Sequence, residues 1–146
     1  MAVERSAKAT WEGDLFGGSG QVSTDTGAVS NATVKWSSRA EEADENTSPE
    51  ELIAAAHATC VSMALANVLA QAGTPPAKLD TEATATFDKT PDGFRLTTMR
   101  LSVRGQVEGL DEDGFRKAAE DAKENCPVSQ ALKGNVELTV ETTLEG

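Results

Sequence analysis

An uncharged stretch of 26 residues, from Leu52 to Ala77, constrains this chain more than any other feature of its sequence. The stretch is rich in alanine and predicts a long helix that runs through about Gln71 and is closed by Gly73. Ser48-Pro49-Glu50-Glu51 predicts the helix start, because it supplies a capping hydroxyl, a proline at the first helical position and a glutamate at the third. Such a helix is about 35 Å long.

A helix without charges on any side is either buried all round or lies in a membrane. The polar residues His57, Thr59 and Asn67 and the many alanines argue against a membrane span. We therefore expect the central helix of the fold, buried against a sheet and against a second copy of the chain.

Composition bounds the classes of function. The 146 residues suffice for one domain, predicted to cover 1–146, and the six aromatic residues predict a modest core that association would extend. Thirteen basic against 24 acidic residues give a net charge of −11, which repels nucleic acid and anionic lipid. The charged segment Met1–Trp11 predicts no signal peptide, so we expect a cytosolic protein.

The rest of the chain predicts an α+β fold. Thr90-Pro91-Asp92-Gly93 is a turn tetrad between two alternating segments, with a slip near Thr97-Thr98 that indicates a bulge. Asp111 opens an amphipathic helix that Pro127 ends. The expected strands are 6–12, 21–24, 32–38, 80–89, 94–105 and 136–144, and the further helices are 111–126 and 128–133.

The two cysteines are too few for a disulfide-rich secreted scaffold. Cys60 lies in the middle of the buried helix, where a thiol is most often an inert core residue. Cys126 precedes Pro127 at a helix start, where the helix dipole favours a thiolate. From the residues alone, Cys126 is therefore the more reactive candidate.

Other chemistry is less strongly indicated. His57, the single histidine, gives no recognisable zinc spacing with the two cysteines, so we expect neither metal nor cofactor. A His57–Cys60 nucleophile pair is conceivable, although a hydrogen-bonded core histidine fits better. Arg39 closes the expected third strand, and Glu50 is left available at the second helical position. Since Glu50 and Cys60 lie about 15 Å apart along a straight helix, any cooperation between them needs a broken helix or a second subunit.

Two longer motifs carry a family resemblance. Ser-Pro-Glu-Glu-Leu-Ile-Ala-Ala-Ala-His-Ala-Thr-Cys-Val-Ser-Met-Ala-Leu (48–65) and Asn-Cys-Pro-Val-Ser-Gln-Ala-Leu (125–132) resemble the OsmC/Ohr family of thiol peroxidases. Ala-Thr-Trp-Glu-Gly (9–13), Val-Ser-Thr (22–24) and Pro-Asp-Gly-Phe (91–94) extend the match over essentially the whole chain. His57 and the Ser-Gln-Ala-Leu ending are more similar to the OsmC (osmotically induced) branch.

The resemblance implies an intertwined homodimer of OsmC-like fold, with antiparallel sheets around a central helix and active sites at the subunit interface. It implies that Cys60 is the peroxidatic cysteine and Cys126 the resolving one. It also implies that Arg39 and Glu50 flank the reactive thiolate, with Glu50 holding the guanidinium in a bidentate pair. The implied reaction reduces organic hydroperoxides through a Cys60–Cys126 disulfide, which an external dithiol such as a lipoylated protein or thioredoxin reduces.

Apolar walls formed by Leu52, Ile53, Met63 and Phe94 or Trp36 would favour an alkyl hydroperoxide over hydrogen peroxide. Two alternatives stay open. The first is a non-catalytic stress protein that binds an apolar ligand in its cleft. The second makes Cys60–Cys126 a structural disulfide, worth about 4 kcal/mol for a loop of this size.

Overall fold

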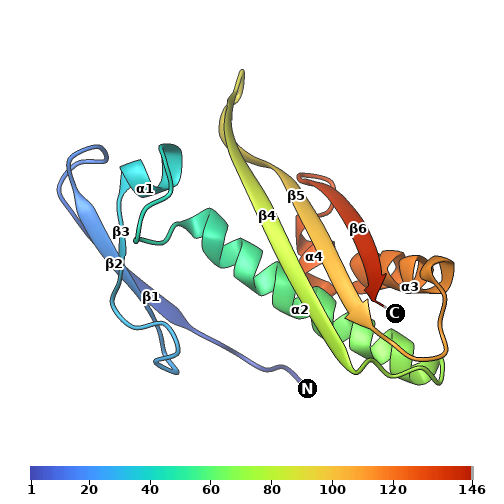
Figure 1. The fold of residues 1–146 in the computed structure, drawn as a ribbon. Helices are drawn as coiled ribbons and strands as arrows, with labels where there is room; N and C mark the ends of the chain where they lie inside the picture. Colours follow the sequence, from blue (N-terminus) through green and yellow to red (C-terminus); the bar gives the residue numbers. More distant parts are fainter. Residues whose placement is uncertain (146) are drawn as a thin grey trace. The chain divides into compact units, whose positions relative to one another are not determined.

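The structure of the protein is a computed structural model that describes residues 1–145. Its contacts divide the chain into two compact units, residues 1–52 and residues 53 onward (Figure 1). Each unit is described below by itself. The expectation of one domain over 1–146 stays a prediction.

The first unit is a small antiparallel sheet followed by a short helix. Its strands are β1 (Ala7–Glu12), β2 (Ser19–Thr24) and β3 (Ala32–Val34), in the order β1-β2-β3, and its helix is α1 (Trp36–Ala40). The expected strand over 32–38 is therefore wrong beyond Val34, and Arg39 lies in a helix. The reason is pairing: Val34 is already opposite Gly20, next to the first residue of β2, so the ladder has almost no partner left.

The long helix, α2 (Pro49–Gln71), has the predicted bounds. Ser48 caps it as expected, since its hydroxyl accepts a hydrogen bond from the Glu51 backbone N–H at 3.1 Å. The Glu51 carboxylate accepts a hydrogen bond from the Thr47 hydroxyl at 2.8 Å. The serine of the predicted capping box therefore caps the helix as expected. The Glu51 side chain binds the Thr47 hydroxyl instead of the backbone N–H of Ser48.

The second unit contains the larger sheet, formed by β4 (Lys78–Thr90), β5 (Gly93–Gln106) and β6 (Glu137–Glu145) in that order. β4 and β5 form the predicted antiparallel hairpin, and their register shifts after Thr86, opposite Thr97, which confirms the bulge. β6 runs parallel to β5, so the expectation of purely antiparallel sheets is wrong here. The two helices between them, α3 (Glu112–Asn125) and α4 (Pro127–Leu132), form a crossover long enough to return the chain parallel.

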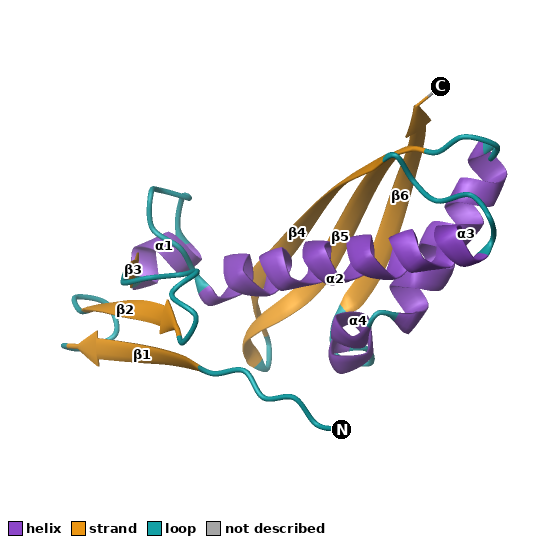
Figure 2. Ribbon diagram, turned by 90° about the horizontal axis from the view of Figure 1, so that it is seen from below, coloured by secondary structure: helices purple, strands orange, loops and turns teal. Residues whose placement is uncertain are grey.

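The core of the second unit lies between the sheet and the helices α2 and α3, which cover the same face (Figure 2). β5 directs alternate residues into this core, and Gly105 belongs to this row because a Cβ there would lie 2.4 Å from the Phe115 ring. The largest cluster of buried apolar residues is Val61, Leu65, Leu69, Leu101, Val103, Val107, Phe115, Ala119, Ala122 and Cys126, and Met99 and Val136 are buried as well.

Only one stripe of α2 enters this core. The buried positions His57, Val61, Leu65 and Leu69 recur every four residues, whereas Met63 on another face is 69% exposed. The expected burial of α2 against the sheet is therefore confirmed, and its burial against a second copy of the chain stays a prediction. Among residues 1–145, α2 is also the one helix long and apolar enough, by length and composition, to cross a membrane.

Candidate functional site

Two thiols that lie far apart in the sequence meet in the second unit. Cys60 in α2 and Cys126 at the start of α4 have their sulfur atoms 2.7 Å apart, and both are free cysteines. Cys126 is fully buried, and Cys60 is partly buried at the edge of the apolar core. The two sulfur atoms are therefore close enough to form a disulfide once one of them has been oxidised.

The local sequence places Cys126 at a sharp change of direction. Pro127 prevents α3 from continuing, so Cys126 leaves the helix with extended dihedral angles (φ −60°, ψ 128°). Its backbone N–H still donates to the Ala122 carbonyl at 2.9 Å, and α4 begins directly at Pro127. Cys126 is thus both the last cap of one helix and the first cap of the next, as predicted.

The electrostatics of Cys60 within this unit oppose a thiolate. Burial raises the pKa of the Cys60 thiol above its ordinary value, and the contact with the neighbouring Cys126 thiol raises it further. The backbone N–H of Val128, in the first turn of α4, acts in the opposite direction and lowers this pKa. A positive charge close to Cys60 would oppose this rise and favour the thiolate.

The first unit contains a positive group held in a defined orientation. Arg39 donates from Nε to Glu50 Oε1 at 2.9 Å and from Nη2 to Oε2 at 3.0 Å, which is the expected bidentate pair. The side chain of Glu50 is 11% exposed and that of Arg39 is 35% exposed. The carboxylate thus fixes the plane of a guanidinium that is still partly open to solvent.

An apolar hollow of about 470 Å³ adjoins this arginine within the first unit. Phe16 packs edge-on against Trp36 at 5.7 Å between ring centroids, close to the hollow. Of the apolar walls expected from the sequence, only Trp36 lines it. The full lining is Trp11, Gly13, Leu15, Val34, Lys35, Trp36, Arg39 and Pro49.

His57 is a fully buried core residue with one hydrogen bond. Its Nε2 lies 2.7 Å from Ser129 Oγ, while its Nδ1 has no hydrogen-bond partner within the described part of the chain. Burial lowers the His57 pKa, which favours the neutral ring. An unpartnered lone pair is less costly than an unpartnered N–H, which assigns the proton to Nε2 as a donor to Ser129.

The structure thus brings together two pairs of predicted site residues, Cys60 with Cys126 and Arg39 with Glu50. It also shows a residue that sequence reasoning missed, Ser129. One feature of the sequence pointed to it: His57 precedes Cys60 by three residues, and Ser129 follows Cys126 by three. If the two cysteines meet, the same spacing brings His57 and Ser129 together. No group of three or more His, Cys, Asp or Glu side chains suited to a metal occurs among residues 1–145.

Comparison with known proteins identifies relatives along most of the chain. Residues 42–141 match the family model described as OsmC-like protein. The chain is 41% identical over 138 residues to peroxiredoxin OsmC of Escherichia coli, covering 94% of this chain and 96% of that protein. It is 35% identical over 107 residues to organic hydroperoxide resistance protein OhrA of Bacillus subtilis, covering 70% and 72% of the two chains.

Solved structures share the fold. The organic hydroperoxide resistance protein OhrB of Bacillus subtilis superposes with a TM-score of 0.70 at 24% identity and covers 94% of this chain and 98% of its own. An OsmC-like protein of Vibrio cholerae reaches a TM-score of 0.75 at 19% identity, over 97% of this chain and 100% of its own. At these identities the likeness concerns the fold.

Proposed function

The chain belongs to the OsmC-like protein family, and from this premise we propose that it is a thiol peroxidase that reduces organic hydroperoxides to alcohols. The observation that carries the proposal is the 2.7 Å separation of two free sulfur atoms, Cys60 and Cys126, whose residues are 66 positions apart. The names of the relatives, a peroxiredoxin and a hydroperoxide resistance protein, support the same chemistry.

In the proposed reaction, the Cys60 thiolate attacks the hydroxyl oxygen of the hydroperoxide. A sulfur–oxygen bond forms as the oxygen–oxygen bond breaks, and the departing alkoxide takes up a proton and leaves as an alcohol. Cys60 is then a sulfenic acid. The Cys126 thiol attacks its sulfur, a disulfide forms, and water leaves with the hydroxyl group and the thiol proton.

Arg39 is proposed to stabilise the Cys60 thiolate and the charge that develops on the peroxide oxygens. A guanidinium opposes the effect of burial on the Cys60 pKa and donates several hydrogen bonds in one plane. Glu50 is proposed to act through Arg39, since its two oxygen atoms occupy two of those donors and fix the plane.

We propose a homodimer as the working form. In the single chain, α2 exposes small and apolar residues, with Met63 69% exposed, and a second copy would bury this surface. An external dithiol, lipoylated or thioredoxin-like, is proposed to regenerate the enzyme by two thiol–disulfide exchanges. The cytosolic location stays a prediction.

Adding one equivalent of cumene hydroperoxide per subunit to the fully reduced protein tests the proposal. We expect rapid loss of both thiols and of about 2 Da, because one disulfide replaces two S–H groups. Intact-mass spectrometry and a free-thiol assay measure this change. Cumyl alcohol, which has the same apolar group without the peroxide bond, is the control and leaves both thiols intact. Unchanged thiols after peroxide would overturn the peroxidase reading and favour a protein that binds an apolar ligand.

The hollow beside Arg39 predicts the substrate class. Replacing Leu15 by asparagine keeps the branched shape of the side chain but removes apolar lining, so kcat/KM for cumene hydroperoxide should fall about fivefold to thirtyfold. The value for hydrogen peroxide should stay unchanged because that substrate has no apolar part. Val3→Asn is the matched control, since Val3 is also an exposed apolar residue of the first unit but lies outside the hollow. Equal losses for both peroxides would contradict the assignment.

A further inference from the structure

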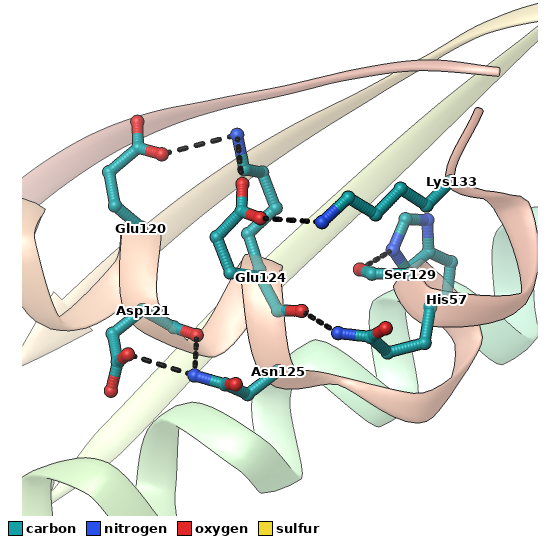
Figure 3. Close-up of polar contacts among 9 residues, drawn as sticks. His57, Glu120, Asp121, Glu124, Asn125, Ser129 and Lys133 are labelled. Atoms are coloured by element: carbon teal, nitrogen blue, oxygen red, sulfur yellow. Dashed lines mark hydrogen bonds and ion pairs between the residues drawn. The ribbon is translucent and has the colours of Figure 1, made fainter.

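The proposed cycle makes no use of the fully buried pair His57 and Ser129, which lies beside the two thiols. The His57 ring in α2 reaches Ser129 in α4 through a 2.7 Å hydrogen bond, and Ser129 is 2% exposed (Figure 3). Both side chains are removed from water, so the loss of either partner would leave a buried polar group unpaired.

This hydrogen bond and the thiol pair lie one helical turn apart. His57 and Cys60 are separated by three residues in α2, and residues with this spacing share a helix face. Cys126 and Ser129 have the same spacing at the start of α4. The two contacts are therefore consecutive links between the same pair of helices, which run in opposite directions where they meet.

The other side-chain polar contacts in α4 and just after it lie at the surface and are weaker. The helix has only six residues, too few to be stable by itself, and Ser129 is its one buried residue. Lys133 pairs with Glu124 of α3 at 3.8 Å, but both side chains are more than half exposed. Gln130 donates to the Glu124 backbone carbonyl, also at the surface.

We infer that the His57–Ser129 hydrogen bond is a latch that holds α4 against α2 and thereby positions Cys126 to attack Cys60. His57 and Ser129 are thus positioning residues for disulfide formation. The inference rests on the proposed role of Cys126 as the resolving thiol. Its physical basis is that the disulfide forms only from the fraction of molecules in which α4 is docked.

The equilibrium with oxidised and reduced glutathione tests the latch without any peroxide. In this exchange, one oxidised glutathione accepts two electrons, the Cys60–Cys126 bond forms, and two glutathione thiols are released. For Ser129→Ala we expect the equilibrium constant for the intramolecular disulfide to fall about fivefold to tenfold, as the loss of one buried hydrogen bond permits. Intact-mass spectrometry of acid-quenched samples gives the ratio of the two forms.

Two comparisons separate the latch from a general loss of stability. Ser62→Ala is the matched control. Ser62 lies in α2, as His57 does, and its hydroxyl donates to a side chain of another element, Thr81 in β4, at 2.7 Å. The substitution should lower thermal stability without changing the disulfide equilibrium. Threonine and valine have nearly equal volumes, but only threonine keeps the hydroxyl. Ser129→Thr should therefore retain a larger equilibrium constant for the disulfide than Ser129→Val.

A peroxide experiment then distinguishes failure of the latch from failure of the proposed function. With excess cumene hydroperoxide, Ser129→Ala should lose its Cys60 thiol at nearly the normal rate but accumulate Cys60 sulfinic acid, because slow attack by Cys126 leaves the sulfenic acid open to a second oxidation. Wild-type and Ser62→Ala protein should yield disulfide. If wild-type protein keeps both thiols after peroxide, the proposed function fails, and the glutathione equilibrium still tests the latch. If Ser129→Ala matches Ser62→Ala in the glutathione equilibrium, the latch is wrong and the pair is only structural.

Discussion

Replacing Cys60 by serine is expected to reduce cumene hydroperoxide turnover to below about 1% of the wild-type rate, because a serine hydroxyl neither ionises near neutral pH nor carries the oxidation. The substitution removes only the reactive atom, and Cys60 is partly buried at the edge of the core, so the fold should persist. A coupled assay with a dithiol reductant measures the rate. Circular dichroism and sedimentation check that fold and assembly are unchanged.

Cys126→Ser is the informative companion, since it removes the partner thiol 2.7 Å away and leaves Cys60 in place. The first oxidation should proceed, and the chain should gain about 16 Da as a sulfenic acid rather than lose 2 Da. Further peroxide should carry Cys60 to the sulfinic acid. Residual turnover by Cys60→Ser above background, or disulfide-like mass loss in Cys126→Ser, would contradict the assigned roles.

Arg39→Ala is expected to lower kcat/KM for cumene hydroperoxide about 100-fold at pH 7, as typical of the loss of one preorganised donor at a reaction centre. Burial raises the pKa of the Cys60 thiol, and without the guanidinium only the backbone N–H of Val128 opposes that effect. The remaining activity should therefore rise with pH, and it should level off at a higher pH than the activity of the wild type does. Rates and thiolate absorbance measured against pH report the change.

Arg39→Lys should lose about tenfold, because an ammonium group keeps the charge but cannot reproduce the bidentate pair with Glu50. The double variant Arg39→Ala/Glu50→Gln removes the carboxylate that Arg39→Ala alone would leave largely buried and unpaired, which separates the catalytic loss from instability. Arg104→Ala is the charge-matched control, since Arg104 pairs with Glu145 on an exposed part of β5. An unchanged Cys60 pKa in Arg39→Ala would disprove the proposed role of the arginine.

Features governed by neighbouring residues were predictable from the sequence. Ser48 and Pro49 determine where α2 begins, and the tetrad Thr90-Pro91-Asp92-Gly93 determines the hairpin between β4 and β5. The extra residue at Thr97 shows as a break in alternation, and Pro127 ends α3. Each of these signals depends on interactions within a few positions of the chain.

The tertiary structure decided what depends on distant partners. Trp36 continues an alternating pattern, yet the strand stops at Val34 because β2 offers almost no further partner, so Arg39 lies in a helix. One stripe of α2 is buried because one sheet face and α3 cover it, a fact that an uncharged helix does not reveal.

The candidate site divides along the same line. The sequence by itself gave the reactive residue types, and by resemblance it gave their roles, because thiols, a guanidinium and a carboxylate are recognisable wherever they fold. That Cys126 lies 2.7 Å from Cys60 and that Ser129 binds His57 followed only from the docking of α4 on α2. Contacts across 66 and 72 positions depend on packing of the whole second unit, which no local pattern encodes.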